Sequence, residues 1–128
     1  MIITHATCML TGFLSMVAGI TIVLFMREKL WWLRAHRRLG TVAIVCLLLG
    51  FMAAVFMVAR LTGRHFAVPH AWLGIITILS ALGTYTAGLM QFKIKIARVR
   101  LLHRWAGRGT FVLMILNIVS GLFLAGIL

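Results

Sequence analysis

The sequence almost lacks acidic side chains. Glu28 is the single Asp or Glu among 128 residues, against 13 Lys and Arg and a formal net charge of +12. Hydrolysis by a pair of carboxylic acids needs two such groups, so this mechanism is excluded. A carboxylate-bridged dimetal site and an intramembrane carboxylate relay for protons are excluded for the same reason.

Cysteine and proline are scarce as well. Cys8 and Cys46 both lie in apolar stretches, and no CxxC motif occurs. We therefore expect neither a disulfide nor a redox-active dithiol, and we interpret both cysteines as packing residues. The single proline, Pro69, stands directly before a long apolar run, where it suits the first turn of a helix.

Apolar residues dominate what remains. They make up 63% of the chain, and the mean hydropathy is +1.13. About 20 apolar residues cross a bilayer as a helix, and the sequence offers four such runs, at about 2–26, 39–59, 70–90 and 102–128. The first run has no basic leader and no cleavage site typical of a signal peptide, so we expect it to be retained. The predicted fold is an all-α, integral membrane four-helix bundle forming one domain over residues 1–128.

The basic residues gather between the apolar runs. One group lies between the first and second runs, and the other lies between the third and fourth or just inside the fourth. These groups are Arg27, Lys29, Arg34, Arg37 and Arg38, and Lys93, Lys95, Arg98, Arg100, Arg104 and Arg108. The middle connection carries only Arg60 and Arg64. Cytoplasmic loops are enriched in Lys and Arg, so we expect both termini on the non-cytoplasmic side and no binding of nucleic acid.

Four of the five histidines lie at or near the start of successive apolar runs, at nearly equal intervals along the chain. They are His5, His36, His70 and His103. In antiparallel spans, the first and third histidines would share one depth and the second and fourth the other. Two imidazoles at one depth suit the axial positions of a haem b, whereas structural zinc needs about four ligands at one point. Without a CxxCH motif the haem would be bound non-covalently. We therefore predict two haem b groups, with these histidines as the iron ligands.

The surroundings of the predicted ligands are partly readable. A histidine near a helix start can donate its second ring N–H to a carbonyl one turn earlier. Cationic side chains could bind the haem propionates, or could simply set topology at the lipid headgroups. The candidates are Arg34, Arg37, Arg38, Arg104 and Arg108 for the inner haem, and Arg60 and Arg64 for the outer one.

Glycines follow three of the histidines at a fixed spacing. Gly40, Gly74 and Gly107 each lie four residues after a histidine, and further small residues continue each helix face. Those further positions are Gly50, Gly88 and Gly121, with Gly12 and Gly19 following His5. Such a stripe would allow either close helix packing or the approach of a flat macrocycle.

Three short motifs carry a resemblance. They are RAHRRLG at 34–40, PHAWLG at 69–74 and LHRWAGR at 102–108. With one histidine per span, the chain resembles the eukaryotic-type cytochrome b561 family over nearly its whole length. The resemblance implies two bis-histidine haems, His5 with His70 and His36 with His103. It also implies a transmembrane oxidoreductase moving single electrons from cytoplasmic ascorbate to semidehydroascorbate or ferric chelates, commonly as a homodimer.

The sequence departs from that family in two respects. The usual fold has six helices, and the chain shows no clear counterpart of the cytoplasmic ascorbate motif. The donor could therefore be a quinol or a partner protein. Three alternatives stay open: a haem b membrane subunit of a larger respiratory or dehydrogenase complex, a metal or ion permease using His5, His70, Met9 and Met16, and a structural membrane adaptor. The fifth histidine, His65, is interpreted as a loop residue.

Overall fold

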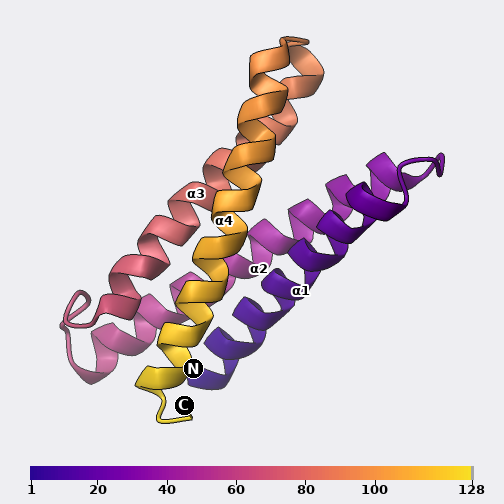
Figure 1. The fold of residues 1–128 in the computed structure, drawn as a ribbon. Helices are drawn as coiled ribbons and strands as arrows, with labels where there is room; N and C mark the ends of the chain where they lie inside the picture. The colour runs from indigo at the N-terminus through magenta and orange to yellow at the C-terminus, as the bar shows by residue number, and fades with distance from the viewer. Residues whose placement is uncertain (128) are drawn as a thin grey trace. The chain divides into compact units, whose positions relative to one another are not determined.

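The computed structural model describes residues 1–127, which form four long helices joined by short connections (Figure 1). The helices are α1 (Ile2–Phe25), α2 (Trp32–Leu61), α3 (Pro69–Lys93) and α4 (Ala97–Leu124). Each contains an apolar window long enough to cross a hydrocarbon core. The predicted class, an all-α protein with four membrane spans, is confirmed. Leu128, the last residue of the predicted fourth span, lies outside the described residues.

The helices are not identical with the predicted spans. α2 begins at Trp32 rather than near residue 39, and α4 begins at Ala97 rather than near 102. Apolar composition marks only the part of a helix inside lipid, whereas arginine and lysine are good helix formers that continue it beyond the membrane. Pro69 is the first residue of α3, as predicted. α4 ends at Leu124, and Gly126 beyond it has φ +69°, a left-handed conformation common after helix ends.

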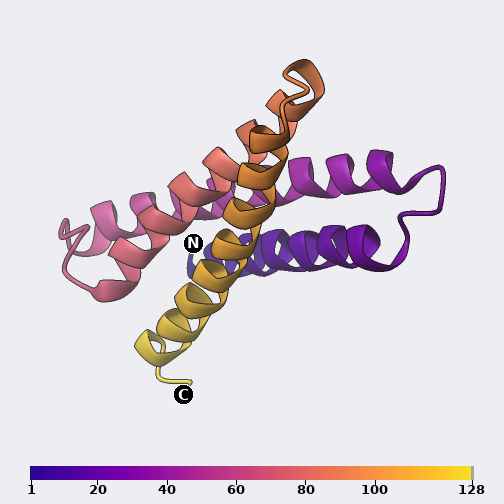
Figure 2. The same cartoon turned by 45° about the horizontal axis from the view of Figure 1, so that its top comes forward.

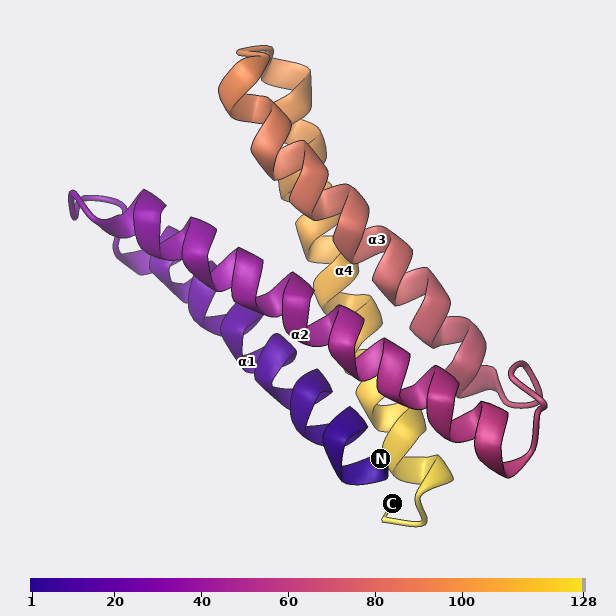
Figure 3. The ribbon, with the colours of Figure 1, turned by 180° about the vertical axis from the view of Figure 1, so that it is seen from behind.

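The chain divides into two compact units. The first, residues 1–60, is here called the N-terminal hairpin and contains α1 and nearly all of α2. The second, from residue 61 onward, is the C-terminal hairpin and contains α3 and α4. Within each hairpin the two helices run antiparallel and side by side, as Figures 2 and 3 show from two directions. Each hairpin therefore has a closed end, at its connection, and an open end.

Close backbone contact holds the N-terminal hairpin together at its glycines. A Cβ atom added to Gly12 would lie 3.1 Å from Leu47 Cγ and 3.2 Å from the carbonyl oxygen of Ala43. A Cβ atom on Gly50 would lie 3.1 Å from Cys8 Cβ. In this hairpin both glycines pack against the neighbouring helix, which is the first of the two interpretations of the glycine stripe.

Gly12→Ala is expected to destabilise the N-terminal hairpin by about 1–3 kcal/mol, because overpacking forces side chains or backbone to move. The Ala43 carbonyl is backbone and has little freedom to retreat. Gly40→Ala is the matched control, since a Cβ there meets nothing within 4 Å. Reversible unfolding in detergent should separate the two variants. Equal stability of both would contradict the packing described here.

Candidate functional site

Both histidines of the N-terminal hairpin are hydrogen-bonded to the backbone of the neighbouring helix. His5 on α1 places its Nδ1 2.8 Å from the carbonyl oxygen of Gly50 on α2. His36 on α2 places its Nδ1 3.1 Å from the carbonyl oxygen of Gly19 on α1. The two contacts run in opposite directions, so each helix supplies one imidazole and one acceptor to the other.

The C-terminal hairpin repeats this arrangement. His70 Nδ1 lies 3.1 Å from the carbonyl oxygen of Asn117, and His103 Nδ1 lies 2.9 Å from that of Thr84. In all four helices the acceptor stands fourteen positions after the histidine of the same helix. Positions at this interval lie close to one helix face, since four turns take about 14.4 residues. The four helices therefore carry one pattern, a histidine and a backbone acceptor four turns later.

These contacts place a proton on one named nitrogen of each ring. A carbonyl oxygen can only accept, so the Nδ1 atom facing it must carry the proton. A neutral imidazole protonated at Nδ1 has its lone pair at Nε2, the atom that binds a metal ion. The sequence analysis predicted that one ring N–H donates to a backbone carbonyl, but it did not correctly predict which carbonyl accepts. The carbonyl one turn earlier in the same helix was the wrong choice, because the acceptor in all four contacts lies on the neighbouring helix.

Glycines make room for two of the rings. A Cβ on Gly88 would lie 2.9 Å from Cε1 of His103, and one on Gly121 would lie 3.0 Å from Cε1 of His70. Gly19 is less tightly covered, since its Cβ would lie 3.5 Å from Nδ1 of His36. The His70 and His103 rings thus rest on the backbone of the neighbouring helix at positions where a side chain would displace them.

The glycines four residues after a histidine behave differently. A Cβ on Gly40 would meet nothing within 4 Å, and one on Gly107 would make an ordinary 3.6 Å contact with Thr84 Cγ2. A Cβ on Gly74 would lie 3.8 Å from Nδ2 of Asn117. The glycines that the imidazoles require are therefore those of the opposite helix, which the motifs around the histidines did not indicate.

The sequence interpretation also missed a cluster of hydroxyl groups in the C-terminal hairpin. Ser80 Oγ and Thr84 Oγ1 on α3 lie 2.7 and 2.9 Å from Thr110 Oγ1 on α4. Thr110 is 2% exposed, and its hydroxyl lies 2.8 Å from the carbonyl oxygen of Ala106. One signal could have indicated the cluster, namely the spacing of Ser80 and Thr84 one turn apart on an apolar helix.

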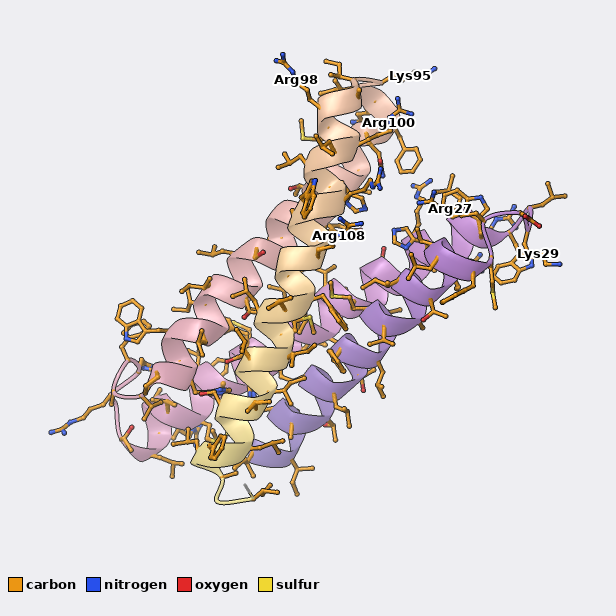
Figure 4. All side chains as sticks on the ribbon, viewed as in Figure 1. Arg27, Lys29, Lys95, Arg98, Arg100 and Arg108 are labelled. Carbon is orange, nitrogen blue, oxygen red and sulfur yellow. The ribbon has the colours of Figure 1, made fainter. Side chains whose placement is uncertain are left out.

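The basic residues gather at the closed end of each hairpin. Figure 4 shows Arg27 and Lys29 at the α1–α2 connection, and Lys95 and Arg98 at the α3–α4 connection. Arg108 lies further along α4, with its guanidinium carbon 4.7 Å from the ring centre of Trp105. This contact orients the Arg108 side chain along the helix surface.

The other predicted propionate ligands are placed as follows. Arg37 and Arg38 directly follow His36 on α2, and Arg104 directly follows His103 on α4. Arg60 lies in the last turn of α2. Arg64 lies in the connection to α3, where its backbone N–H donates to Thr62 Oγ1 at 3.3 Å. Arg37, Arg38 and Arg104 therefore each lie within two residues of a predicted ligand on the same helix.

Four membrane-length helices, each with one histidine anchored through Nδ1, define an integral membrane protein in which every span offers one imidazole as a candidate metal ligand. The comparison with known families narrows the class. The model of the family described as eukaryotic cytochrome b561 matches residues 4–127, so the chain belongs to this family, as predicted. No curated protein and no solved structure gives a significant match. Membership indicates a multi-pass membrane protein that uses haem b in transmembrane electron transfer.

The donor set fits haem b better than a structural metal ion. Nowhere in residues 1–127 do three His, Cys, Asp or Glu side chains come together as a metal ion would require. A haem needs only two axial ligands from the protein, and neutral imidazoles with the lone pair at Nε2 are suitable. The fourfold repetition of the Nδ1 contact gives four histidines in which Nε2 is the candidate ligand atom.

Proposed function

We propose that the chain binds two haem b groups through four histidines and carries single electrons across the membrane. His5 and His70 would ligate one iron, and His36 and His103 the other. The observation that carries this proposal is the repeated contact between each Nδ1 and a backbone carbonyl. The pairing itself rests on the alternation of the spans and on the family. A haem b with two imidazole ligands supplies one-electron transfer between ferric and ferrous iron.

The spacing within each hairpin supports two redox centres at different depths. On α2, the acceptor for His5 is Gly50, which stands fourteen positions beyond His36. At 1.5 Å per residue this separates the two levels by about 21 Å, against roughly 30 Å for a hydrocarbon core. On α3, Thr84 stands beyond His70 by the same interval. Each hairpin therefore supplies one ligand toward either face of the membrane.

The charge distribution supports an orientation. The closed ends hold the two basic groups, which favours their placement in the cytoplasm and both termini on the other side. Arg37, Arg38, Arg104 and Arg108 would then bind the propionates of the inner haem. Arg60 and Arg64 would bind those of the outer one.

The same distribution supports a donor and a direction. A cationic cytoplasmic face attracts an anionic donor of the ascorbate type, and a quinol is the other candidate. An inside-negative potential favours outward transfer by about 2.3 kcal/mol per electron for each 100 mV. The acceptor would be of the ferric chelate or semidehydroascorbate type. The chain would act alone or as a homodimer.

The test is the haem content of the purified chain and its reduction from each face. We expect two non-covalent haems per chain with a reduced b-type spectrum, and reduction by ascorbate or a quinol added on the side of the closed ends. Proteoliposomes with a ferric chelate trapped inside would measure transfer across the membrane. Fewer than two haems per chain would contradict the proposal, and a colourless protein that binds zinc or copper tightly would favour the permease alternative.

A further inference from the structure

The two hairpins hold their closed-end histidines differently. In the N-terminal hairpin the acceptor for His36 is Gly19, which has no side chain. In the C-terminal hairpin the acceptor for His103 is Thr84, whose side chain has a contact of its own. The acceptor residue for His103 therefore carries a hydroxyl group with a hydrogen bond of its own, whereas the acceptor residue for His36 has no side chain.

The single hydroxyl proton of Thr110 determines the direction of every hydrogen bond in the hydroxyl cluster. Thr110 Oγ1 donates its single proton to the Ala106 carbonyl. It can then only accept from Ser80 and Thr84, so both of their hydroxyl groups donate to it. Thr110 Oγ1 is thereby fully used, with one bond donated and two accepted. In an apolar helix interface such a satisfied group specifies one register of the two helices.

Thr84 is held at two atoms by α4. Its carbonyl oxygen accepts from His103 Nδ1, and its hydroxyl donates to Thr110, two turns further along α4. The His103 ring also rests on Gly88, one turn beyond Thr84 on α3. A shift of α3 against α4 would therefore change the His103 hydrogen bond directly. The bond from Thr84 to Thr110 opposes that shift.

We propose that Thr110 is a positioning residue for His103, acting through Thr84 to set the hydrogen bond at Nδ1 and hence the reduction potential of the haem that His103 ligates. The inference rests on the proposed function for its redox part alone. Hydrogen bonding at Nδ1 raises the basicity of an imidazole ligand, and a more basic ligand stabilises ferric iron. The cluster would therefore lower one of the two potentials and make the two haems unequal.

The N-terminal hairpin has different residues at the positions that correspond to Thr84 and Thr110. Seven residues after His36 stands Ala43, and seven residues after His103 stands Thr110. Ser15 and Ser80 each stand four residues before the acceptor of their helix. The two hairpins thus differ at the acceptor and at the residue facing it, where the hydroxyl groups of Thr84 and Thr110 have no equivalent.

The test compares Thr110→Val with Thr110→Ser in the full chain. Valine keeps the shape and removes the acceptor, whereas serine keeps the hydroxyl. Thr77→Val is the matched control. Thr77, on α3, is buried like Thr110, but its hydroxyl donates to the Leu73 carbonyl of its own helix. In Thr110→Val, Ser80 and Thr84 can turn to carbonyls of their own helix, so the variant should fold.

Two readouts are expected to move together. In redox titrations of the haem-loaded chain, Thr110→Val should raise one midpoint potential, by about threefold to tenfold in the one-electron equilibrium constant, or roughly 30–60 mV. The affected haem should be the one missing in His103→Ala. In haem-free protein labelled with ¹⁵N histidine, solvent exchange of the His103 Nδ1 proton should become faster. Thr110→Ser should resemble the original chain in both readouts.

The outcomes separate the two proposals. Unchanged proton exchange in Thr110→Val, or equal changes in Thr77→Val, would overturn the positioning role. A change in exchange at all four histidines would do so as well, because it would indicate general loosening. A chain that binds no haem would refute the proposed function, while the exchange measurement would still decide whether Thr110 positions His103.

Discussion

His36→Ala and His103→Ala are expected to remove the same haem and to leave the other in place. Each substitution takes away one of the two axial ligands of a non-covalently bound haem, which is then lost on purification. His5→Ala and His70→Ala should remove the second haem in the same way. Haem content together with the reduced spectrum of the remaining haem measures the result, and the two variants of one pair should give the same spectrum.

His65→Ala is the control for these four variants. His65 lies in the connection between α2 and α3 and belongs to neither predicted pair. We expect this variant to keep both haems. If His36→Ala and His103→Ala instead left different haems behind, the pairing would be wrong even if the chain carried two haems.

Gly88→Ala should cause the loss of the haem ligated by His103, without any change to a ligand. The added Cβ would lie 2.9 Å from Cε1 and 3.1 Å from Nδ1 of the His103 ring. The ring is rigid and its Nδ1 lies 2.9 Å from the Thr84 carbonyl oxygen, so a shift away from the added methyl group would strain that hydrogen bond. Overpacking of this kind costs about 1–3 kcal/mol. Haem content and the spectrum of the remaining haem provide the measurement.

Two further glycine substitutions, at positions with more space around the added Cβ, serve as controls for Gly88→Ala. Gly83→Ala, on an exposed face of α3 where a Cβ meets nothing within 4 Å, should keep both haems. Gly19→Ala places its Cβ 3.5 Å from Nδ1 of His36, an ordinary contact, and should also keep them. Retention of both haems by Gly88→Ala would show that the His103 ring has more freedom than the structure gives it.

Much of the fold could be predicted from the sequence, because a helix that crosses a membrane needs about 20 apolar residues and such runs are evident in the sequence. The four helices follow from that requirement. Their ends do not, since Trp32 and Ala97 lie in basic stretches where hydropathy falls while helix propensity stays high. The candidate ligands stand out for a similar reason, because the sequence places one histidine in each predicted span.

The acceptors of the histidine rings could not be predicted in the same way. They are backbone carbonyls, and every residue has one. Gly19 and Gly50 attract notice as glycines, but Thr84 and Asn117 serve the same purpose with other side chains. The pattern becomes visible only when the contacts reveal the common interval between histidine and acceptor within each helix. Thr110 was missed because its role depends on α3 and α4 lying side by side.

The anchoring of each imidazole within its own hairpin has a consequence for biogenesis. His5 and His36 find their acceptors within Met1–Arg60, and His70 and His103 find theirs in the remainder of the chain. If the helices enter the membrane two at a time during synthesis, His5 and His36 would be oriented before His70 and His103 are made. The orientation of each ring would then be set before any cofactor binds.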